Sequence, residues 1–328
     1  MSNLSGRVLK GDRIAISKAI SELENRGKGY HSLLEGIFPF TGRSFVVGIT
    51  GPPGTGKSSI VDRLLKIYRE RGRKVGVLAI DPTSPISGGA ILGDRVRMMS
   101  HSLDKGVYIR SMASRGEQGG LSRAARGAAR VLDAAGNDFV FLETVGTGQA
   151  EVEVVRVADM VIVVLMPELG DEVQAVKAGL MEIGDIFAVN KSDLPGADKV
   201  LFNLRQVLGQ KSGWHQSALK ISAKTGEGLE QLVSKIDECK DYLKKSGGLD
   251  KRRVENAIEE LLQNVSTTIA ESAKQKLKSM NELEELSEKI AKREVDPETA
   301  SRLLLSRFDF EPKLKDGNSR SRTRKRRR

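Results

Sequence analysis

Eight consecutive residues form a candidate phosphate-binding loop. Residues 51–58 read GPPGTGKS, a complete G-x-x-x-x-G-K-S pattern between an apolar run at 45–49 and a helical pattern that starts at Ser58. Glycines let the backbone wrap a phosphate, and the N–H groups of the loop and helix N-terminus attract its oxygens. A glycine-rich turn is the plain alternative, but the complete pattern predicts a nucleoside triphosphate site. The predicted binding residues here are Gly51, Pro52, Pro53, Gly54, Thr55, Gly56, Lys57, Ser58 and Ser59.

Carboxylates after the second apolar run could complete this site. Lys57 is expected to reach the β- and γ-phosphates as a catalytic residue, and Ser58 to hold Mg²⁺. Asp81 ends an apolar run, and Asp94 follows in the glycine-rich stretch DPTSPISGGAILGDR. Either aspartate alone could be a turn or helix cap, but together, opposite a phosphate loop, they predict Mg²⁺ binding, with Asp94 also near the γ-phosphate.

A second acidic motif follows another apolar run. In FLETVGTGQ, Glu143 at a strand end is expected to order a water on Mg²⁺, and the Gly146 N–H to donate a hydrogen bond to the γ-phosphate. Thr147 stands where many GTPases carry a water-orienting glutamine, which predicts slow unaided hydrolysis. Candidate compensating groups are Gln149, Arg110 and Arg115.

A third motif, NKSD at residues 190–193, predicts recognition of guanine. Asp193 can accept hydrogen bonds from the guanine N1 and exocyclic amino groups. Adenine would leave that carboxylate unpaired, which is costly. SAKTG at residues 222–226 follows the next apolar run and is expected to supply a backbone contact to the base. The predicted base-binding residues are Asn190, Lys191, Asp193, Ser222, Ala223 and Lys224.

Short apolar runs separated by helical patterns must position these motifs. Such a pattern predicts an α/β fold with a mainly parallel sheet covered by helices on both faces, and ligands bind beyond the carboxyl ends of the strands in such sheets. The predicted strands are 45–49, 75–80, 107–110, 139–142, 160–165, 186–189 and 219–221.

Helical extensions flank this predicted domain. A helical pattern covers 11–24, and a glycine-containing connection is expected to run to about Arg43. Residues 250–296 contain neither glycine nor proline and repeat apolar residues every three or four positions, which predicts one long amphipathic helix or two. This arm could pack on the core or against another helix. Asp296 and Pro297 resemble the cap and first position of a further helix. The expected divisions are 1–43, 44–247, a helical arm at 248–310 and a tail at 311–328.

Composition limits the class of protein. The chain has 328 residues, is 39% hydrophobic and contains one cysteine, Cys239, so an intrachain disulfide is excluded. No apolar stretch approaches the roughly 18 residues of a membrane span, and the N-terminus lacks a signal-peptide pattern, so a cytoplasmic protein is expected.

The net charge of +11 is largely a property of the tail. Residues 317–328, GNSRSRTRKRRR, carry seven basic residues and no acidic one. This low-complexity segment predicts disorder, and it could contact nucleic acid, an acidic partner or nothing specific.

The motifs together resemble the MeaB/ArgK family of P-loop GTPases, the methylmalonyl-CoA mutase-associated proteins. The resemblance implies a P-loop NTPase fold and a chaperone that gates cobalamin delivery to, and protects or reactivates, a coenzyme B12-dependent acyl-CoA mutase. It also implies GTP and Mg²⁺ as ligands and a homodimer formed through the C-terminal arm. Its matching stretches are GDRIAISKAISELEN, GITGPPGTGKSS, AIDPTSPISGGAILGDRVRM, FLETVGTGQAEVEV, MPELGDEVQAVKAGLMEI, AVNKSD and VDPETASRLL.

By position, the resemblance implies that Lys57 and Ser58 contact phosphate and Mg²⁺, and that Asp193 reads guanine. The metal-side carboxylates would be Asp81, Asp94 and Glu143. A further loop, PELGDEVQ, is implied to switch and to signal to the partner, with Glu168 and Leu169 where the family has small residues. The implied switch residues are Asp171, Glu172, Gln174 and Lys177.

Other functions stay open from the sequence. Some relatives carry an older label that suggests an ATPase or kinase accessory of basic amino-acid transport, against which the NKSD motif argues. A nucleic-acid-associated GTPase would use the basic tail. A nickel-delivery GTPase is less favoured, because His31, His101 and His215 are scattered along the chain. Which mutase would be served is not encoded here.

Overall fold

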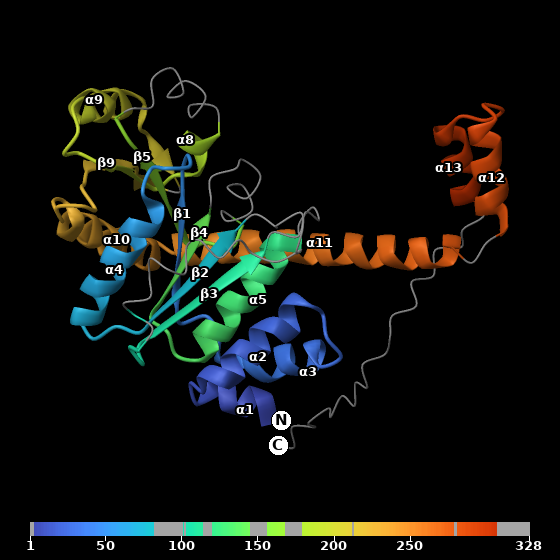
Figure 1. The fold of residues 1–328 in the computed structure, drawn as a ribbon, viewed down its shortest axis with the longest axis horizontal. Helices are drawn as coiled ribbons and strands as arrows, with labels where there is room; N and C mark the ends of the chain where they lie inside the picture. The colour runs from blue at the N-terminus through green and yellow to red at the C-terminus, as the bar shows by residue number, and fades with distance from the viewer. Residues whose placement is uncertain are drawn as a thin grey trace, which may run out of the picture. The chain divides into compact units, whose positions relative to one another are not determined.

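Seven parallel strands form one sheet in the order β3-β2-β4-β1-β5-β6-β9 in this computed structural model (Figure 1). They correspond to the seven predicted strands, with small shifts at their ends. The predicted α/β fold with a parallel sheet is therefore confirmed. The strands are β1 Phe45–Thr50, β2 Val75–Asp81, β3 Val107–Ala113, β4 Phe139–Thr144, β5 Met160–Leu165, β6 Ile186–Val189 and β9 Ser217–Lys220.

The sheet belongs to the first of two compact units, which span Met1–Ala257 and Ile258–Arg328. In the part of the chain described here, no helix is both long and apolar enough to cross a membrane. The structure describes residues 3–81, 101, 103–113, 120–144, 156–167, 179–211, 213–278 and 281–306.

Helices α4 (Lys57–Glu70) and α10 (Leu229–Lys245) cover one face of the sheet. Alternate residues of the strands point to this face, so Phe139 and Phe141 of β4 lie in the same fully buried cluster as Tyr68 of α4. The Tyr68 and Phe139 rings are 4.3 Å apart between centroids. Burying such a side chain contributes roughly 1.5–3 kcal/mol, which holds the helix after the phosphate loop against the sheet.

The opposite face is covered in two parts, so the prediction of helices on both faces is also confirmed. Next to β2 and β4 lies α5 with the N-terminal helices, and next to β5 and β6 lie α8 and α9. These helices are α1 Asn3–Leu9, α2 Arg13–Glu24, α3 Tyr30–Ile37, α5 Gly120–Ala134, α8 Leu180–Ile183 and α9 Ala197–Val207.

The predicted connection up to Arg43 is wrong in part, because it contains α3 and a 3-10 turn, Phe38–Phe40. Leu33 and Ile37 of α3 are buried against the N-terminal cluster. A helix this short is marginal alone and depends on tertiary packing, so its local sequence gives a weak signal. Helix α1 was missed for the same reason.

The C-terminal helices agree with the predicted pattern. The expected amphipathic arm is α11 (Gly248–Lys278) followed by α12 (Asn281–Ala291), and α13 (Pro297–Ser306) begins at the expected proline. The Asp296 carboxylate accepts hydrogen bonds from the N–H groups of Glu298 and Thr299, at 3.0 and 2.9 Å, which confirms the predicted cap.

Two adjacent arginines hold the first turns of α11 at the amino edge of the sheet. Arg252 donates to both carboxylate oxygens of the fully buried Asp185, which precedes β6, at 2.7 and 3.1 Å. Arg253 donates to both oxygens of Asp159, which precedes β5, at 2.8 Å each. These hydrogen bonds raise the pKa of the Arg253 guanidinium. We call Arg252, Arg253, Asp159 and Asp185 the arginine clamp.

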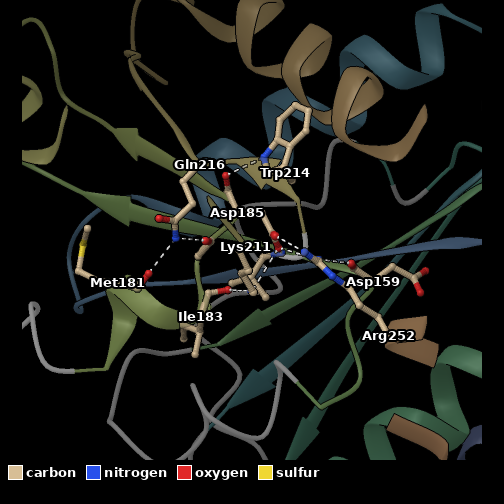
Figure 2. A network of polar contacts seen from close by, with 10 residues as sticks. Asp159, Met181, Ile183, Asp185, Lys211, Trp214, Gln216 and Arg252 are labelled. Atoms are coloured by element: carbon tan, nitrogen blue, oxygen red, sulfur yellow. Dashed lines mark hydrogen bonds and ion pairs between the residues drawn. The ribbon is translucent and has the colours of Figure 1, made fainter. Parts of the chain in front are cut away.

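An unpredicted hairpin completes the surroundings of Asp185. Strands β7 (Gln210–Lys211) and β8 (Trp214–His215) pair antiparallel. Figure 2 shows Lys211 and Trp214 reaching toward Asp185, whose carboxylate lies 3.5 Å from the Lys211 ammonium and whose carbonyl accepts from the Trp214 indole at 3.2 Å. Burial lowers the pKa of Lys211, and the Asp185 charge partly offsets this shift.

We expect Arg252→Met to lower the free energy of unfolding by about 3–5 kcal/mol. The buried Asp185 carboxylate would lose two hydrogen bonds and a neighbouring positive charge. Urea denaturation of the full chain measures this change. The matched control is Arg302→Met, since Arg302 forms an exposed helical pair with Glu298 and such pairs contribute little. If both variants changed the free energy of unfolding by the same small amount, a structural role for the clamp would be contradicted.

Candidate functional site

The predicted phosphate-binding loop connects β1 to α4 at the carboxyl edge of the sheet. Its glycines adopt backbone angles that other residues rarely tolerate. Gly51 has a φ of +139°, and a Cβ atom there would lie 2.1 Å from the Val164 carbonyl oxygen of β5. Gly56 has a φ of +88° and immediately precedes α4. Glycine at these positions therefore permits both the turn and its close approach to the neighbouring strand.

Lys57 is buried, and its ammonium lies inside the loop. It donates to the carbonyl oxygens of Gly51 and Pro52 at 2.7 and 2.9 Å. These bonds hold a positive charge beside the N–H groups at the start of α4, where phosphate oxygens are attracted. The position agrees with the role predicted for Lys57.

Ser58 and Glu143 bring two predicted metal-side groups together. The Ser58 hydroxyl donates to a carboxylate oxygen of Glu143, and both side chains are buried. Glu143 lies on β4, which pairs with β1, so the sheet register places the carboxylate opposite the start of α4. A hydroxyl and a carboxylate in contact provide the hard oxygen ligands that Mg²⁺ prefers.

Asn190 joins the phosphate loop to the segment at 222–226 that is predicted to contact the base. We call residues 222–226 the base loop. Its amide group donates to the Thr55 carbonyl at 2.7 Å, and its amide oxygen accepts from the Ala223 N–H at 3.0 Å. A Cβ atom on Gly56 would lie 2.4 Å from the same Asn190 nitrogen. The two motifs, distant in sequence, are thus joined through a single buried side chain.

Asp193 is exposed and is oriented by Ser222. The Ser222 hydroxyl donates to Asp193 at 2.8 Å. This hydrogen bond is the main cause that lowers the pKa of Asp193 below its ordinary value of 3.8. The carboxylate is therefore ionised at neutral pH and can accept two hydrogen bonds from a base edge. Lys191, between the two recognition residues, adopts a left-handed φ of +57°.

Among the remaining candidates for catalysis, metal binding and switching, only Arg110 has a described side chain. Asp81 ends β2 as expected, but its side chain is not among those described. Arg110 on β3 is directed toward α2, where it donates to the Ser21 hydroxyl at 2.9 Å and to Glu24 at 3.4 Å, rather than toward the phosphate loop. The candidates outside the described residues are Asp94, Arg115, Gly146, Thr147, Gln149, Glu168, Leu169, Asp171, Glu172, Gln174 and Lys177.

One contact of the base loop was not foreseen. Arg63 on α4 donates to the carbonyl oxygens of Ala223 and Lys224, at 2.9 and 3.2 Å. An arginine on an amphipathic helix usually extends into solvent, so nothing in the sequence marked this residue. The structure therefore adds a second connection between the helix that follows the phosphate loop and the base loop.

Comparison with known proteins identifies the family. The family model described as "Methylmalonyl Co-A mutase-associated GTPase MeaB" matches residues 15–278. A protein from Pyrococcus abyssi that is named as a GTPase is 45% identical over 93% of this chain and 96% of its own. The GTPase ArgK of Escherichia coli is 34% identical over 77% of this chain and 80% of its own.

Two further relatives extend the comparison. The mouse protein named methylmalonic aciduria type A homolog, mitochondrial, is 34% identical over 74% of this chain and 57% of its own. The crystal structure of a protein titled LAO/AO transport system kinase has a TM-score of 0.70 and 25% identity, and it covers 93% of this chain and 96% of its own. With the sheet order and the phosphate loop, these matches show that the chain belongs to the MeaB family of P-loop GTPases.

Proposed function

We propose that this protein binds and hydrolyses GTP with Mg²⁺ and thereby acts as a chaperone for a coenzyme B12-dependent acyl-CoA mutase, gating cofactor loading and protecting or reactivating the enzyme. The observation that carries the nucleotide part is the Asn190 amide, which joins the phosphate loop to the base loop. A nucleotide that contacted both motifs would place its phosphates at Lys57 and its base at Asp193.

The residues at the phosphate end fit a Mg²⁺-dependent hydrolysis site. Ser58 and Glu143 would hold the ion, directly or through water, and Lys57 would contact the β- and γ-phosphates. Bound Mg²⁺ would neutralise charge that develops on the phosphate oxygens. Because Lys57 is already held by loop carbonyls, it needs little reorganisation to meet a phosphate, and such preorganisation is the main contribution a protein makes to phosphoryl transfer.

The base end favours guanine over adenine. Asp193, ionised and oriented by Ser222, offers acceptors to the N–H donors of guanine, whereas adenine presents no matching pair of donors. This argues against ATP as the nucleotide of an accessory of amino-acid transport.

Substituting Lys57 tests the nucleotide site. We expect Lys57→Ala to weaken GTP binding about 10- to 100-fold, because charge-assisted hydrogen bonds to phosphate contribute roughly 1.5–3 kcal/mol. Calorimetric titration measures binding, and phosphate release with GTP and ATP measures turnover. Lys66→Ala is the matched control, since Lys66 is exposed on the same helix. Unchanged GTP affinity and turnover in Lys57→Ala would show that the assigned site is wrong.

The mutase role is supported by the family description and by the name of the mouse relative. We expect GTP turnover, slow in the protein alone, to increase at least several-fold when a B12-dependent acyl-CoA mutase from the same genome is added. ATP turnover serves as the nucleotide control, and Lys57→Ala shows whether the assigned site is responsible. If neither stimulation nor a complex is found while GTP still binds, the partner assignment fails and the GTPase assignment stands.

A homodimer formed through the helical arm is the third part of the proposal. Val254, Ile258, Leu261 and Val265 repeat on one side of α11 and are 48–63% exposed in the single chain. An exposed apolar stripe of this length favours association with another helix.

Light scattering on the full chain tests this association. We expect a dimeric mass for the wild-type protein and a monomeric mass for Leu261→Asp, because a charge in the stripe would be desolvated by association. Ser266→Asp adds the same charge to an exposed position on the same helix and should remain dimeric. A wild-type monomer at tens of micromolar, or a dimer that survives Leu261→Asp, would argue against this arm as the interface.

A further inference from the structure

We infer that Arg63 is a positioning residue for nucleotide specificity: it holds the peptide groups of Ala223 and Lys224 in the orientation that the base loop needs to recognise guanine. The inference rests on the proposed guanine site and adds a residue that no sequence motif contains. Arg63 lies on α4, six residues after Lys57. The helix that begins at the phosphates would therefore also set the geometry at the base.

The guanidinium of Arg63 fixes two successive peptide groups. Its Nε donates to the Ala223 carbonyl at 2.9 Å, and one Nη donates to the Lys224 carbonyl at 3.2 Å. A guanidinium is a planar fork, so two bonds from one fork restrict the rotation of both peptide planes. A single donor would restrain only one of the two planes in this way.

One branch of this arrangement leads to the phosphate loop. The Ala223 N–H donates to Asn190, whose amide donates in turn to the Thr55 carbonyl. Ala223 is therefore held on its carbonyl side by Arg63 and on its N–H side by Asn190. Both holding residues are tied to the phosphate loop, one through α4 and one through Thr55.

A second branch leads to the residue that reads the base. The Lys224 carbonyl belongs to the same peptide group as the Thr225 N–H, which donates to the Ser222 hydroxyl oxygen at 3.2 Å. That hydroxyl donates to Asp193 at 2.8 Å. If Arg63 released the Lys224 carbonyl, this peptide could rotate, and the hydrogen bond that orients Ser222 toward Asp193 would be lost.

Loss of Arg63 should therefore change specificity rather than phosphate binding. Asp193 and the base loop contribute to GDP binding but not to binding of inorganic triphosphate, which has no base. A residue that merely stabilised the fold would reduce both affinities together. The two probes separate a positioning role from a structural one.

The test is calorimetric binding of GDP, ADP and inorganic triphosphate to the full chain. We expect Arg63→Ala to weaken GDP binding about tenfold, the equivalent of one charge-assisted hydrogen bond, and to change triphosphate binding by less than about twofold. The GDP-to-ADP preference should fall by about the same tenfold. Arg63→Lys keeps the charge and most of the side chain and can reach one carbonyl. We therefore expect its GDP affinity to lie between those of the wild type and Arg63→Ala.

Arg71→Ala is the matched control, because Arg71 caps the C-terminus of the same helix. Its ion pairs are with Glu230 and Asp237 on α10 and not with the base loop. It should keep the wild-type preference for GDP. An unchanged GDP-to-ADP ratio in both Arg63 variants, or equal losses for GDP and triphosphate, would overturn the role of Arg63. If the wild-type protein itself bound GDP no better than ADP, the guanine site would fail, and the role of Arg63 with it.

Discussion

The proposed nucleotide site depends on one buried carboxamide, that of Asn190. A carboxamide is both donor and acceptor, so Asn190 can satisfy the Thr55 carbonyl of the phosphate loop and the Ala223 N–H of the base loop simultaneously. Aspartate would lose the donor, lysine would lose the acceptor, and leucine would lose both. The absence of a side chain at Gly56 makes room for this contact. The spacing between the two ends of the site is thus set by the protein before a nucleotide binds.

The sheet explains why residues so far apart in sequence meet at Asn190. Strand β1 lies between β4 and β5, and β5 pairs with β6. All of these strands are parallel, so the loops that follow them emerge at one edge. Glu143 arrives there from β4, the phosphate loop from β1 and Asn190 from β6. Among the described residues, helices α4, α5, α8, α9 and α10 follow β1, β3, β5, β6 and β9.

The sequence predicted what short-range patterns encode. Near-continuous apolar runs located all seven strands, because strands buried on both faces admit few polar residues, and the motifs located the loop at Gly51–Ser58 and the NKSD residues. The sequence did not predict α3, the β7–β8 hairpin, Arg63 or the arginine clamp. Arg252 and Asp185 are 67 residues apart, and no local pattern distinguishes an arginine that will pair with a buried carboxylate from one that remains in solvent.

The arginine clamp positions the first turns of α11 as well as stabilising them. Desolvation of two charges offsets much of their attraction, so well-packed apolar residues could replace a buried ion pair with little loss. Apolar contacts, however, tolerate sliding and rotation. Adjacent residues on a helix point about 100° apart, so the two pairs, Arg252 with Asp185 and Arg253 with Asp159, together restrict the rotation and axial position of the first turns of α11. Those aspartates precede β6 and β5, and β6 runs directly from Asp185 to Asn190. One four-residue strand therefore connects Asp185, which binds the first turns of α11, to Asn190, which joins the phosphate loop to the base loop.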